Sequence, residues 1–185
     1  MTGLEFAAME RLLIRVTSLV AFAIVLATDI LYVGLIGSQG QDFQPYVPRF
    51  VASYLAVMAA LIVIALLPRP EIFAIRLPMR AAAAGGLLAL GFLAAFSIGL
   101  PLVVAGVLTT VALTRTSRRP GSALRRLAGL GAALLAIGLL VAGLEITGRL
   151  IVCPATGTAS GTGSGLVTGG YSYQCNEGTL TFHSG

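Results

Sequence analysis

Charged residues are scarce in this sequence. Asp, Glu, Lys and Arg together make up 10% of the 185 residues, whereas soluble domains contain about 25%. Hydrophobic residues make up 57%, and the mean hydropathy is +0.94. This composition excludes an ordinary soluble domain and predicts an integral membrane protein. Lysine is absent altogether, which together with the excess of Ala and Gly indicates a GC-rich bacterial source.

Motifs for catalysis and cofactor binding are missing as well. The sequence has no HExxH motif, no Ser, His and Asp arrangement, and no pair of carboxylates within an apolar run. The single histidine, His183, has only Glu177 and the two cysteines nearby as further metal ligands, so we expect no metal site. Neither a Lys nor a predicted helix follows Gly161, Gly163 and Gly165, which argues against a nucleotide-binding loop. We therefore expect no enzyme activity and no cofactor.

The basic residues do not indicate a nucleic-acid partner either. The net charge is +5 and the pI is near 9.9, but the arginines do not lie in a soluble domain large enough to dock a duplex. In a membrane protein, arginines in short loops instead mark the cytoplasmic side. This rule provides the predicted orientation of the chain.

Apolar runs divided by polar, Pro-rich or Arg-rich segments predict five transmembrane helices. The predicted spans cover residues 12–36, 50–67, 80–98, 101–116 and 127–152. A short interfacial helix is expected before the first span. A signal peptide cleaved near Val25, Leu26 and Ala27 is an alternative for the first run, but the run extends well past these residues and further spans follow.

The longest apolar run, residues 81–113, contains no charge over its 33 residues. A straight helix of that length would measure about 50 Å, well beyond the roughly 30 Å of bilayer hydrocarbon. If the run is one helix, the twelve arginines divide into six inside and six outside; if it is two helices, they divide into ten and two. The second division obeys the positive-inside rule, so we predict a helical hairpin that turns at Gly99 to Pro101.

The segment after this hairpin carries most of the topological signal. The predicted cytoplasmic determinants are Arg115, Arg118, Arg119, Arg125 and Arg126. The same arginines could also bind anionic lipid headgroups. Both interpretations place this segment on the cytoplasmic side.

The C-terminal tail, residues 153–185, is then expected outside the cell. Cys153 and Cys175 would lie in an oxidising compartment, which favours a disulfide, although an unlinked pair stays open. The first half of the tail has the composition of a flexible linker. The second half alternates and turns as a β-hairpin does, from Tyr171 to His183.

Four polar residues form the candidate site. Asp29 is the one acid well inside an apolar run, and Tyr32 lies near the same helix face. Glu145 and Arg149 have the spacing of a helical ion pair near the outer end of the last span. Asp29 could serve as an ion or proton site, or as the polar floor of a ligand pocket under the tail. It could instead be a structural tether to Arg149 or Arg49, or to a backbone or hydroxyl group.

The sequence therefore predicts an all-α membrane protein, a five-helix bundle in the plasma membrane with a small extracytoplasmic β-hairpin cap. Its N-terminus would be cytoplasmic and its C-terminus extracytoplasmic. The expected partners are the lipid bilayer and a second protein or another copy of the chain. Alanine repeats such as Ala52, Ala56 and Ala60 favour close helix packing. The expected role is that of a structural or interaction protein, or of an accessory subunit. The alternative is a small transporter or channel subunit that uses Asp29.

Overall fold

The computed structural model describes residues 3–39, 46–69, 72, 75–117 and 123–184, and the statements below concern these residues. Within them the chain forms five helices followed by three strands. The helices are α1 (Gly3–Gln39), α2 (Tyr46–Leu66), α3 (Arg76–Leu93), α4 (Gly99–Ser117) and α5 (Ala123–Gly148). The strands are β1 (Thr158–Gly165), β2 (Gly169–Asn176) and β3 (Thr179–Ser184).

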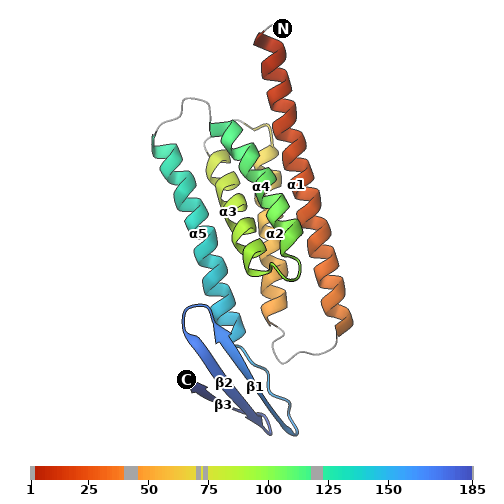
Figure 1. Cartoon of the computed structure of the whole chain (residues 1–185), viewed down its shortest axis with the longest axis vertical. Coiled ribbons are helices and arrows are strands. Elements are labelled where there is room, and N and C mark those ends of the chain that lie inside the picture. The colour runs from red at the N-terminus through yellow and green to blue at the C-terminus, as the bar shows by residue number, and fades with distance from the viewer. Residues whose placement is uncertain (1–2, 40–45, 70–71, 73–74, 118–122, 185) are drawn as a thin grey trace.

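The helices run alternately up and down, so consecutive helices are antiparallel (Figure 1). The start of α1 lies at the same end as the C-terminal ends of α2 and α4. The sheet lies at the opposite end, beyond the C-terminal end of α5. The first helix begins well before its predicted span and includes, without a break, the described part of the segment expected to form a short interfacial helix.

The long apolar run forms two antiparallel helices, α3 and α4, as the charge count predicts. The turn lies at residues 94–98 rather than at Gly99, which instead begins α4. The backbone nitrogens of Ser97 and Gly99 both donate to the Ala94 carbonyl, at 2.9 and 2.8 Å. A Cβ at Gly99 would clash with the Gly91 carbonyl of α3. Gly99 is therefore needed for the close approach of the two helices, not as a stop signal for α3.

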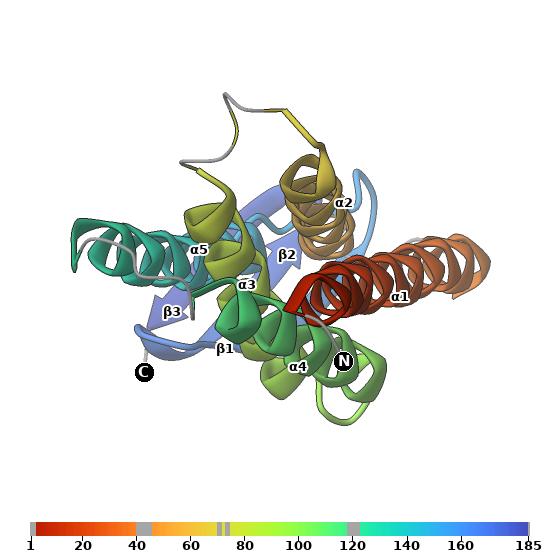
Figure 2. The same ribbon diagram turned by 90° about the horizontal axis from the view of Figure 1, so that it is seen from above.

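Helix α3 is the centre of the bundle. It packs against α2, α4 and α5, whereas α1 packs against α2 and α4 (Figure 2). Most of its middle is buried, including Ala83 and Leu87, which have no exposed surface. Its small residues allow neighbouring helices to approach closely: a Cβ at Gly85 would lie 3.1 Å from the Ala133 side chain of α5. Short side chains on α3 thus define the core of the bundle.

Three helical segments are long and apolar enough to cross a membrane: Leu12–Ile36, Tyr46–Leu66 and Ala123–Gly148. They also expose large apolar side chains, such as Leu31 and Leu135, each 65% exposed. In water such surfaces would be unfavourable, whereas lipid accommodates them. These three helices indicate a membrane location.

The tail forms a three-stranded antiparallel sheet in the order β1, β2, β3. The predicted hairpin corresponds to β2 and β3, and its turn places Glu177 and Gly178 at positive φ, as a two-residue type I′ turn requires. The segment that we expected to be a flexible linker supplies β1 instead. Its glycines explain why: Gly161 and Gly163 pair with Tyr173 and Tyr171 of β2, and the tyrosine rings occupy the space where a Cβ would lie.

Candidate functional site

The junction between α5 and the sheet contains a group of polar contacts around Glu145, one of the predicted site residues. The side chain of Glu145, on the last turn of α5, is only 15% exposed. Its Oε2 accepts hydrogen bonds from the backbone nitrogens of Leu166 at 2.9 Å and Val167 at 3.4 Å. The Thr168 hydroxyl donates to Oε1. Glu145 therefore holds the whole turn between β1 and β2.

Two further links join the same parts of the chain. The Tyr171 hydroxyl of β2 donates to the Gly148 carbonyl at the end of α5, at 2.6 Å. Cys153, five residues beyond α5, forms a disulfide with Cys175 of β2, with a Cα separation of 5.5 Å. This confirms the predicted disulfide. Cys175 is fully buried, so the cross-link lies inside the small core of the sheet.

The predicted pair of Glu145 and Arg149 is present, with the guanidinium Nη2 3.4 Å from Oε1. Arg149 is about half exposed, so the ion pair itself contributes little stability. The main effect of Arg149 is to balance the negative charge of the Glu145 carboxylate, which accepts the hydrogen bonds from the turn between β1 and β2. The sequence predicts the pair from its spacing but does not predict that Glu145 binds the sheet.

Asp29 and Tyr32 lie on α1, which packs against α2 and α4, and the structure does not place them beside Glu145 and Arg149. Asp29 makes no ion pair with any described residue. Its Oδ1 is buried and has no hydrogen-bond partner there. Tyr32 packs against the hydrophobic core. On the same helix Ser18 and Thr28 are buried, and their hydroxyls donate to carbonyls of their own helix at 2.8 Å.

The predicted cytoplasmic arginines gather away from the sheet. Arg115 lies in the last turn of α4, and Arg125 and Arg126 are exposed in the first turns of α5. Arg118 and Arg119 lie outside the described residues. Two further arginines, Arg76 and Arg80, begin α3 at the same end of the bundle.

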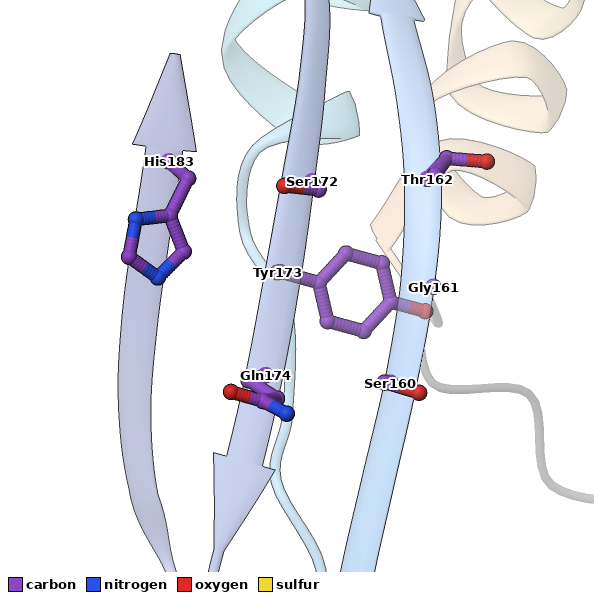
Figure 3. A pocket seen from close by; sticks show the side chains of 7 residues that line it. All are labelled: Ser160, Gly161, Thr162, Ser172, Tyr173, Gln174 and His183. Atoms are coloured by element: carbon purple, nitrogen blue, oxygen red, sulfur yellow. The ribbon is translucent and has the colours of Figure 1, made fainter. Parts of the chain in front are cut away.

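The sheet has one polar and one apolar face because its residues alternate along paired strands. The polar face carries a shallow hollow of about 370 Å³, shown in Figure 3. The hollow is lined by Ser160, Gly161, Thr162, Ser172, Tyr173, Gln174 and His183. The lining contains no Asp, Glu, Lys or Arg side chain. Among the residues that the structure describes, no three His, Cys, Asp or Glu side chains are close enough to hold a metal ion.

No family model matches the chain, and no characterised protein and no solved structure is detectably similar to it.

Proposed function

We propose that the chain is a plasma-membrane protein in which all five helices enter the bilayer, with the start of α1 in the cytoplasm and the sheet outside. The distribution of arginines supports this orientation. Arg76, Arg80, Arg115, Arg125 and Arg126 belong to helix ends at the end of the bundle opposite the sheet. Positive residues in short loops favour the cytoplasmic side.

The hairpin of α3 and α4 is short but suited to lipid. Its helices have 18 and 19 residues, so each measures about 27 to 29 Å at 1.5 Å per residue. The turn between them bears no charge, and the side chains of Phe92, near the end of α3, and Phe96, within the turn, are largely or fully exposed. Backbone nitrogens of Ala94, Ala95, Ser97 and Gly99 find acceptors within the hairpin. An apolar turn with internally bonded backbone groups is compatible with membrane depth.

We propose a non-enzymatic role in which the bundle presents the sheet at the outer surface for interaction with another protein, as an accessory or structural subunit. The observation that carries this proposal is the triple attachment of the sheet to α5. A carboxylate, a tyrosine hydroxyl and a disulfide fix the orientation of a sheet that a flexible linker would leave free. Because the orientation of the sheet is fixed, its polar face, which includes Thr162 and His183, keeps one direction in which a partner can bind it.

A photo-crosslinking experiment tests this role. A benzophenone amino acid placed at Thr162 in native membranes should give a discrete protein adduct, whereas the same probe at Leu135, on the apolar surface of α5, should not. The adduct should weaken in Glu145→Gln, because the neutral amide is a poorer acceptor for the turn. The absence of any protein adduct at Thr162, or an adduct pattern identical at both positions, would reject the interaction role.

A transporter or channel subunit is the second candidate, and Asp29 favours it. An acid in a membrane helix with a buried oxygen that no described residue pairs is expensive, and such residues commonly mark ion or proton pathways. In proteoliposomes with an entrapped pH-sensitive dye, this function predicts a proton flux that Asp29→Asn abolishes. Equal flux in both proteins and in empty liposomes would reject it.

A further inference from the structure

The turn between β1 and β2 is apolar at its tip and exposed. Leu166 is 54% exposed and Val167 is 75% exposed. The turn at the other end of the sheet is polar, with Glu177 and Gly178 at its tip. The two ends of the sheet therefore present opposite chemistry.

The apolar turn lies beside the last helical turn of α5 rather than beyond it. Glu145, which binds the backbone nitrogens of Leu166 and Val167, belongs to the membrane-length segment Ala123–Gly148 and lies three residues before its end. Figure 1 shows this turn next to the end of α5, while the other end of the sheet points away from the bundle. Hydrogen bonds of 2.9 and 3.4 Å thus fix the depth of two apolar side chains relative to a helix that is proposed to span the membrane.

Three hydrogen-bond donors of the turn have an acceptor in that position. Two of its backbone nitrogens and the Thr168 hydroxyl all donate to Glu145, whose charge is balanced by Arg149. Backbone groups without partners would resist transfer from water. Close by along the chain, Ile146, Leu150 and Val152 expose further apolar surface at the end of α5.

We infer that Leu166 and Val167 insert into the outer interfacial layer of the bilayer, so that lipid is the partner of this turn and the sheet is anchored at the membrane surface. The inference rests on the proposed membrane topology. It deepens the proposed function, because a sheet anchored by both α5 and lipid has one fixed tilt at the outer surface. The polar face with Thr162 would remain in water.

Tryptophan fluorescence tests the insertion, because the natural chain contains no Trp. Three full-length single-Trp variants, Val167→Trp, Leu135→Trp and Thr162→Trp, are reconstituted in phosphatidylcholine liposomes containing lipids brominated at defined acyl positions. We expect quenching of Val167→Trp, strongest with bromines near the headgroup, and quenching of Leu135→Trp by deeper bromines. Thr162→Trp should be quenched by aqueous iodide and not by brominated lipid.

The outcomes separate the two levels of the proposal. If Leu135→Trp is quenched by lipid but Val167→Trp responds only to iodide, the anchoring inference is wrong while the membrane topology stands. If Val167→Trp is shielded from both quenchers, the turn is covered by protein, and the lipid inference is again overturned. If Leu135→Trp itself escapes lipid quenching, the proposed membrane location fails.

Discussion

Reducing the disulfide between Cys153 and Cys175 should loosen the sheet without affecting the bundle. The cysteines are 22 residues apart, and this loop contains β1 and most of β2. The entropy of closing a loop of that size corresponds to about 3 kcal/mol. An isolated two-stranded hairpin is marginally stable at best, and three strands are the minimum for independent stability, so we expect the cross-link to contribute a large part of the stability of this three-stranded sheet. Opening of the sheet should become roughly a hundredfold more frequent, at 1.4 kcal/mol per factor of ten.

Hydrogen exchange of the β2 amides, followed in lipid nanodiscs before and after reduction, measures this change directly. Reduction keeps both sulfur atoms in place, so it isolates the cross-link from the packing of the buried Cys175. The double variant Cys153→Ala and Cys175→Ala should lose more protection, because it also removes packing. Amides in the middle of α3 serve as the internal control and should not change. If β2 exchanges equally slowly once two free thiols have been titrated, the argument from loop closure is refuted.

Two substitutions test the packing of the helices. Gly91→Ala should destabilise the bundle by about 1 to 3 kcal/mol in an SDS titration, because a Cβ there would lie 2.9 Å from the Val103 backbone nitrogen of α4. The control variant Gly138→Ala, in open space on α5, should be neutral or stabilising by up to about 1 kcal/mol. Equal effects of the two substitutions would contradict the close contact between Gly91 and Val103. Tyr54→Phe should cost about 0.6 to 1 kcal/mol in the same titration, because it removes a buried hydrogen bond of 3.0 Å from α2 to the Ala136 carbonyl of α5, and unchanged unfolding would show that the hydroxyl contributes nothing.

The helical hairpin could be predicted because it depends on a property of the sequence alone, the distribution of arginines along the chain. The position of its turn could not. Gly99 has the chemistry of a helix stop, but the approach of Gly91 across the hairpin makes it the first residue of α4. Only the three-dimensional contact distinguishes these two uses of glycine.

The sequence also could not predict which face of each helix packs against its neighbours. Ala56 and Ala60 are exposed, although their spacing with Ala52 is typical of a close-packed face. The larger side chains of Tyr54 and Met58 are buried instead and determine which face of α2 turns inward. In a chain so rich in alanine, small residues occur on every face, and their spacing alone carries little information.

The contacts of the tail, including those of the candidate site, could likewise be predicted only in part from the sequence. The cysteines and the hairpin of β2 and β3 have clear sequence signals, but β1 has the composition of a linker and becomes a strand because tyrosine rings cover its glycines. Glu145 was singled out for its helical partner, Arg149. Its bonds to Leu166, Val167 and Thr168 lie 21 to 23 residues away, and no local pattern predicts such contacts. The apolar side chains of Leu166 and Val167, which are unusual in a turn, are a sequence feature that could have indicated a contact at this position.

Cysteine accessibility in intact cells tests the central claim, the orientation of the chain, most directly. Ser160→Cys, on the polar face of the sheet, should react with a membrane-impermeant maleimide added from outside. Ser122→Cys, between α4 and α5, should react only after the membrane is made permeable. Reaction of Ser122→Cys from outside, with Ser160→Cys protected, would contradict the account.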